Sequence, residues 1–196
     1  LNLQTDVPQA AELWSFKGEK AESALLCFQP PMLSTPMDAG QTLVVLVDCS
    51  GSMHGNSIEQ ARKGLKDFLA MSRPQDRLSI IRFGSRILHC TPEPVLLDET
   101  GRALLARKVD SEVKADLGGT EIVEALHEAV RVAGVNGQVL LITDGEAYIL
   151  EKDLAEVVGG KCRIFTVGVC SAVAEQCLQY LADHSGGYCE LTTPNE

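Results

Sequence analysis

The stretch Leu43–Met53 reads LVVLVDCSGSM, an unbroken apolar run that leads directly into an acid and two serines. A continuous apolar run is typical of a strand that is buried on both faces, as strands are in a parallel sheet. In open α/β sheets, ligands bind outside the carboxyl ends of the strands. Asp48, Ser50 and Ser52 therefore follow a predicted buried strand at the position where a binding site is expected.

Four further runs rich in β-branched residues predict strands, and the segments between them have the apolar spacing of helices. The strands are expected at 77–83, 138–144, 162–169 and 187–192. Helices are expected at 57–71 and 120–133, around 154–158 and 173–181, and near 98–110. Ser57 and Gln60 predict a capping box at the start of the first helix, and 86–90 predicts a short antiparallel edge strand. This alternation predicts an α/β fold with a doubly wound, mostly parallel, Rossmann-like sheet flanked by helices.

The first 40 residues do not follow that alternation. LWSFK and ALLCFQ predict two strands of a β-hairpin joined by a glycine-containing turn, and PPMLSTPMDAG predicts a linker. We therefore expect residues 1–40 to form an N-terminal hairpin and linker, and residues 41–196 to form the α/β domain. A lone hairpin is marginally stable in water, so it either packs on that domain or is the remnant of a preceding β domain.

The composition of the chain bears on its binding partners and on its location in the cell. The chain has 196 residues and a formal net charge of −10, which disfavours both nucleic acid and anionic membrane surfaces. It contains neither an apolar run of the roughly 20 residues that a membrane helix needs nor the pattern of a signal peptide at its start. Seven cysteines without a CxxC motif favour free buried thiols and a cytoplasmic location. Cys162 and Cys189 form the pair to suspect if disulfides are present instead.

Two other segments carry oxygen-bearing side chains at comparable positions. VLLITDG places Asp144 at the carboxyl end of a predicted strand, and LGGTEI places Thr120 in the first turn of a predicted helix. Together with the first stretch they supply two carboxylates and three hydroxyls. These hard oxygen donors favour Mg²⁺, with Mn²⁺ and Ca²⁺ as further options. Because Mg²⁺ prefers six oxygen ligands, a carboxylate of another molecule is a natural additional ligand.

The motifs DCSGSM, GGT and TDG, in that order, resemble the metal-ion-dependent adhesion site (MIDAS) of von Willebrand factor A domains. The resemblance covers about residues 42–192, and its narrower features, LGGTEI and TDGE, are similar to the inter-alpha-trypsin-inhibitor heavy-chain group. It implies that the metal ligands are Asp48, Ser50, Ser52, Thr120 and Asp144. It also implies a non-enzymatic module that binds a protein partner through an Asp or Glu of that partner.

Two other functions are compatible with the sequence. One is a Mg²⁺-dependent hydrolase that uses Asp48 or Cys49, although Ser50 stands where aspartyl-phosphate hydrolases need a second acid. The other is a structural module in which the ion only makes the loops rigid. The sequence leaves the oligomeric state open.

Overall fold

The computed structural model describes residues 12–17, 22–27, 40–144, 156–157, 162–169 and 175–192, the first two ranges as backbone only. The chain divides into two compact units, Leu1–Met37 and Asp38–Glu196. In the first unit, β1 (Glu12–Lys17) pairs antiparallel with β2 (Glu22–Cys27), so the expected hairpin is present. Its origin in a larger β domain stays a prediction.

The second unit is built on a seven-stranded sheet with the order β5-β4-β3-β7-β8-β9, in which β6 also pairs with β4. The strands are β3 (Thr42–Asp48), β4 (Arg77–Phe83), β5 (Ile87–His89), β6 (Val95–Leu96), β7 (Gln138–Thr143), β8 (Arg163–Val169) and β9 (Cys189–Thr192). The five strands from β4 to β9 in this order are parallel, whereas β5 and β6 run antiparallel to β4. The predicted doubly wound sheet and its antiparallel edge strand are confirmed. The two-residue β6 is too short to leave a periodic pattern, and it is not predicted.

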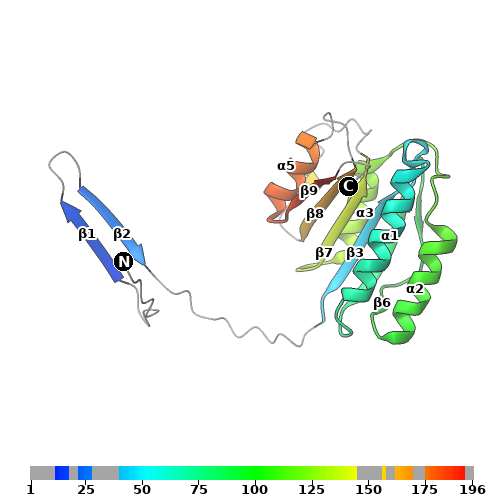
Figure 1. The fold of residues 1–196 in the computed structure, drawn as a ribbon, viewed down its shortest axis with the longest axis horizontal. Helices are drawn as coiled ribbons and strands as arrows, with labels where there is room; N and C mark the ends of the chain where they lie inside the picture. Colours follow the sequence, from blue (N-terminus) through cyan, green and yellow to red (C-terminus); the bar gives the residue numbers. More distant parts are fainter. Residues whose placement is uncertain are drawn as a thin grey trace. The chain divides into compact units, whose positions relative to one another are not determined.

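Helices cover both faces of this sheet. Figure 1 shows α1 (Asn56–Met71) and α2 (Glu99–Glu112) side by side on one face, and α3 (Ile122–Ala133) and α5 (Glu175–Ser185) pack on the other. The predicted capping box is wrong, because α1 begins after Gly55, whose φ of 90° suits glycine, and the cap makes no side-chain hydrogen bond. Within the described residues, no helix is both long enough and apolar enough to cross a membrane.

The central strand β3 contributes to both layers of the core. Val44 and Leu46 pack with residues of α3 and α5, while Val45 and Val47 pack with residues of α1 and α2. All four side chains are fully buried, and burying such a side chain stabilises the fold by about 1.5–3 kcal/mol. The unbroken apolar run thus follows from burial on both faces, and it fixes the position of Asp48 at the end of the strand.

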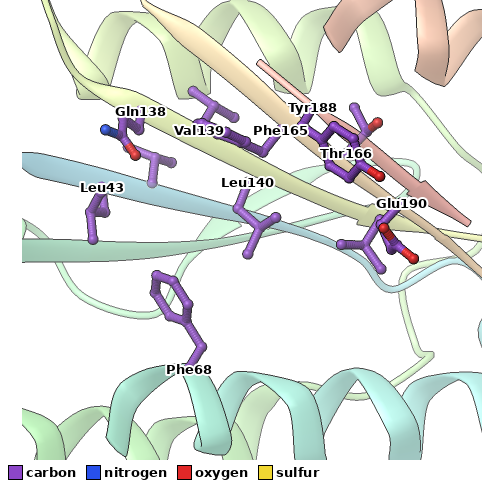
Figure 2. Close-up of a pocket in the computed structure, with 11 residues that line it drawn as sticks. Leu43, Phe68, Gln138, Val139, Leu140, Phe165, Thr166, Tyr188 and Glu190 are labelled. Atoms are coloured by element: carbon purple, nitrogen blue, oxygen red, sulfur yellow. The ribbon is translucent and has the colours of Figure 1, made fainter. Parts of the chain in front are cut away.

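An apolar groove lies on the α1 side of the sheet, over β3, β7 and β8. It has a volume of about 370 Å³. Figure 2 shows Phe68 of α1 directed toward the strands that carry Leu43 and Leu140, with Phe165 and Tyr188 further along the same surface. This half of the sheet therefore presents partly exposed apolar side chains among the described residues.

Candidate metal centre

Two acidic side chains lie at the same edge of the sheet. Asp48 is the last residue of β3, and Asp144 directly follows β7, the parallel neighbour in which Ile142 is paired with Val47. Asp48 is completely buried and Asp144 is 9% exposed. The structure thus brings together the two carboxylates that the sequence places at strand ends, although Asp48 and Thr143, the residue before Asp144, are 95 positions apart in the sequence.

The Asp48 carboxylate accepts hydrogen bonds from two residues, Ser50 and Thr143. The backbone N–H of Ser50 donates to Oδ1 at 2.9 Å, and the Thr143 hydroxyl donates to Oδ2 at 2.6 Å. Burial raises the pKa of Asp48, these hydrogen bonds oppose that shift, and the charge of Asp144 adds to it. Within the described residues no Lys or Arg forms an ion pair with Asp48. A buried carboxylate beside a second acid thus lacks a neutralising cation from this part of the chain.

Thr143 is not predicted from the sequence as part of the site. It is fully buried, and its hydroxyl orients the Asp48 carboxylate from the neighbouring strand. One signal points to it, since it is the hydroxyl-bearing residue of the otherwise apolar run VLLIT, next to Asp144. Such a residue in a buried strand needs a hydrogen-bond partner.

The two serines after β3 lie close together. The hydroxyl oxygens of Ser50 and Ser52 are 3.1 Å apart. Ser50 is almost fully buried whereas Ser52 is exposed, so the pair extends from the strand end toward solvent. The next residue, Met53, is fully buried against the core beneath α1 and α2. Met53 therefore anchors the short 3₁₀ helix Gly51–Met53 that carries Ser52.

Thr120 lies on the loop between α2 and α3, residues 113–121, which we call the Thr120 loop. Two backbone hydrogen bonds join this loop to the segment after β3. The N–H of Leu117 donates to the carbonyl of Cys49 at 2.9 Å, and the N–H of Gly51 donates to the carbonyl of Gly118 at 2.8 Å. The loop is thereby held against the residues that carry the two serines.

The same loop is also bonded to the turn after β4. The N–H of Ser85 donates to the carbonyl of Leu117 at 2.7 Å, and the N–H of Glu121 donates to the carbonyl of Gly84 at 2.9 Å. The Ser85 hydroxyl accepts a bond from the Gly119 N–H at 2.7 Å. A Cβ at Gly84 would lie 2.4 Å from the Cβ of Leu117, so the close approach of the two loops requires glycine there.

Thr120 itself is half-buried and precedes α3, whose N-cap is Glu121. The expectation that Thr120 lies in the first turn of a helix is therefore wrong by two residues. The reason is that backbone bonds to the turn after β4 and to the segment after β3 hold residues 117–121 in a loop, although the apolar spacing that starts at Ile122 is helical. All five predicted ligand residues nevertheless lie on three segments that meet at one end of the sheet.

The donor set can be compared with the preferences of metal ions. It consists of carboxylates and hydroxyls, which suit hard cations. No group of three His, Cys, Asp or Glu side chains able to hold a metal occurs in the described part of the chain. A site built here would therefore depend on the serine and threonine hydroxyls as well as on the two acids.

The cysteines of the described ranges are free thiols: Cys49, Cys90, Cys162, Cys177 and Cys189. The suspected Cys162–Cys189 disulfide is therefore absent. The remaining cysteines, at 27 and 170, lie outside the residues whose side chains are described. Cys49 is fully buried, and burial raises the pKa of its thiol. A buried thiol that resists ionisation is a poor nucleophile at neutral pH, which weakens the hydrolase alternative.

Comparison of the sequence with known proteins agrees with this geometry. The profile of the von Willebrand factor type A domain matches residues 41–191. A von Willebrand factor A domain-containing protein of Dictyostelium discoideum is 32% identical over 155 residues, which is 76% of this chain and 17% of that protein. Inter-alpha-trypsin inhibitor heavy chain H4 of Homo sapiens is 27% identical over 180 residues, covering 82% of this chain and 19% of that protein. The chain spans about a fifth of the length of these relatives.

Solved structures share the fold. A von Willebrand factor type A structure from Catenulispora acidiphila superposes with a TM-score of 0.69 at 20% identity, over 80% of this chain and 39% of that one. Proximal thread matrix protein 1 from the mussel byssus, solved with a zinc-occupied MIDAS motif, superposes with a TM-score of 0.61 at 19% identity, over 81% of this chain and 43% of that one. The family profile covers residues 41–191, and the sheet order and the acids at the ends of β3 and β7 agree with it. The chain belongs to the von Willebrand factor type A domain family.

Proposed function

We propose that this domain is a protein-interaction module that depends on a divalent cation, most simply Mg²⁺, with Mn²⁺ or Ca²⁺ as substitutes. Membership of the family supports the interaction role. One observation carries the metal proposal: the buried Asp48 carboxylate lies beside Asp144 and has no cationic partner in the described residues. An uncompensated buried charge is costly, and a cation bound at this edge of the sheet would neutralise it.

The roles of the five residues follow from their positions. Asp48 and Asp144 would supply charge, and the hydroxyls of Ser50, Ser52 and Thr120 would supply neutral oxygen ligands. The Thr143 hydroxyl and the Ser50 N–H orient the Asp48 carboxylate. The two carboxylates would only balance the charge of a divalent cation. A bound cation could therefore still accept an oxygen ligand from another molecule.

The partner is proposed to bind through an Asp or Glu side chain. The exposed Ser52 and the half-buried Thr120 stand at the solvent side of the site, where an incoming carboxylate would arrive. The chain's net charge of −10 makes direct attraction of an acidic partner unfavourable, so recognition would depend on the cation. Free thiols at the five described cysteines also support the proposed cytoplasmic location.

Calorimetric titration of Mg²⁺ into metal-stripped protein, with and without acetate, tests this function. Wild-type protein should bind one ion, and acetate should increase the affinity. Asp48→Asn should abolish binding because it removes a ligand charge with little change in shape. Asp110→Asn is the matched control, since Asp110 is an exposed acid of α2 that pairs with Lys66, and it should leave binding unchanged.

Each other result has a distinct meaning. Binding that is indifferent to acetate would favour a structural ion over an open, ligand-seeking site. Wild-type protein that takes up no divalent cation would refute the metal proposal. Turnover of a generic phosphate ester that is lost in Asp48→Asn would instead support the hydrolase.

A further inference from the structure

A charged side chain is buried in the core directly below the metal-site loops. Arg82 of β4 is only 7% exposed. It lies on the same face of the sheet as Leu78 and Ile80, which are fully buried apolar residues of the core. Removing a guanidinium from water carries a desolvation cost of several kcal/mol. This arginine therefore needs strong compensating contacts.

Those contacts are directed to the Thr120 loop. The Arg82 guanidinium donates through Nη2 to the carboxylate of Asp116 and to the carbonyl of Lys114, the latter at 3.3 Å. Its Nε is buried and has no hydrogen-bond partner. Burial opposes the charge, but contacts with the Cys49 thiol and the Asp116 charge outweigh it and raise the pKa of Arg82. The guanidinium thus stays charged, and its bonds to Asp116 and Lys114 both reach the Thr120 loop.

Both partners of Arg82 lie at the beginning of the Thr120 loop. Lys114 and Asp116 precede Leu117, and Leu117 is the residue whose backbone bonds to Cys49 and to Ser85. Arg82 therefore holds the beginning of the loop from the core side, while the backbone bonds hold its middle. The distance in sequence is short: Thr120 follows Asp116 by four residues.

Stability alone does not explain such an arrangement. Replacing a buried ion pair by apolar residues of similar size is often neutral or stabilising. Asp116 is also 55% exposed at its side chain, so it could be solvated without Arg82. We propose that Arg82 and Asp116 are positioning residues, which fix the Thr120 loop so that Thr120 stands at the cation site; this inference rests on the proposed function.

The test compares Mg²⁺ affinity with the stability of the metal-free protein. Arg82→Met keeps an unbranched apolar side chain at this position and removes the guanidinium and its charge. We expect Mg²⁺ binding to weaken about tenfold, as is typical when the groups that orient metal ligands are removed. The unfolding midpoint of the metal-free variant should change little, because the Asp116 side chain that is left behind is 55% exposed and stays solvated. Arg82→Lys keeps the charge opposite Asp116 and should recover part of the affinity.

Two further variants make the comparison specific. Asp116→Asn should also weaken Mg²⁺ binding. The double variant should lose no more affinity than Arg82→Met alone, because Arg82→Met already removes the contact with Asp116. Arg73→Met is the matched control. Arg73 also forms an Arg–Asp pair, with Asp76, but at the opposite end of β4, and its loss should not change Mg²⁺ affinity.

A second measurement separates this inference from the proposed function. Amide hydrogen exchange in the metal-free protein should be faster at Leu117 and Gly51 in Arg82→Met, since those N–H groups bond between the loop and the segment after β3. If Arg82→Met bound Mg²⁺ as tightly as the wild type and its amide hydrogens exchanged at the wild-type rate, the positioning role would be overturned. A loss of affinity accompanied by an equal loss of stability that Arg82→Lys does not restore would also overturn it. If the wild-type protein bound no Mg²⁺, the proposed function would be refuted. The hydrogen-exchange rates of the metal-free variants would then decide on their own whether Arg82 holds the Thr120 loop in place.

Discussion

Replacing Thr143 by Val tests the central hydrogen bond of the site. The substitution keeps the shape of the side chain and removes the hydroxyl that donates to Asp48 at 2.6 Å. Both residues are fully buried, so no water replaces the lost donor. A hydrogen bond to a charged group contributes about 1.5–3 kcal/mol, and we expect metal-free Thr143→Val to be destabilised by about 2 kcal/mol. For a domain of this size, that corresponds to a fall in Tm of about 4–8 °C.

The pH dependence of this loss provides a second check. The folded-state pKa of Asp48 is raised by burial and the Asp144 charge, and it is lowered by the Thr143 hydroxyl. Because the folded pKa lies above the unfolded value, ionisation of Asp48 costs stability as the pH rises through the folded pKa. Removing the hydroxyl raises that pKa further and enlarges the cost. The difference between variant and wild type should therefore be smallest below the unfolded pKa and should grow as the pH rises toward the folded pKa.

Thr166→Val is the matched control, measured by urea denaturation at pH 7 and at acid pH. Thr166 is equally buried in the same sheet, but its hydroxyl donates to the neutral carbonyl of Leu178 at 3.2 Å. Its loss should cost about 1 kcal/mol and should not depend on the charge of Asp48. Equal stability losses in the two variants at both pH values would refute the reasoning about Asp48.

Three other substitutions give outcomes that follow from single contacts, each measured by chemical denaturation. Bonding to Arg131 lowers the pKa of Glu128 from 4.5. Glu128→Gln should therefore lower stability by less than about 1 kcal/mol above pH 4.5 and should have no effect below the folded pKa. A loss of stability that is the same at every pH would contradict this. Gly84→Ala should destabilise by about 1–3 kcal/mol, because its Cβ would overlap Leu117. Gly64→Ala, in the exposed middle of α1 with open space around it, should instead stabilise by about 0.5–1 kcal/mol; the same sign for both glycines would contradict the overlap.

The sheet and the ends of its strands could be predicted because burial leaves a local pattern. The apolar run before Asp48 and the run before Asp144 each indicate a strand covered on both faces, and parallel strands bring their carboxyl ends to one edge. The helices follow from apolar spacing in the same way. The start of α3 was predicted two residues early, because the bonds that hold Thr120 in a loop come from segments distant in sequence.

The supporting contacts could not be predicted for a physical reason. An arginine in the run RLSIIRF has no local sign of burial, and its partner Asp116 lies 34 residues away. The Thr143–Asp48 bond likewise depends on which strands become neighbours, which strand patterns alone do not determine. Sequence patterns identify the residues at the edge of the sheet, whereas the contacts that orient them depend on tertiary packing.

The groove over β7 and β8 affects how the unfolding of this chain should be observed. Its partly exposed apolar wall, which includes Phe68 and Leu140, gives a fluorescent apolar dye a surface to adsorb to in the folded protein. A dye-based melting curve would then begin from a high signal and understate the transition. Tryptophan emission is no substitute, because the single tryptophan, Trp14, belongs to β1 in the other unit. Far-ultraviolet circular dichroism, which reports the helices and strands themselves, is the appropriate signal for every stability measurement described above.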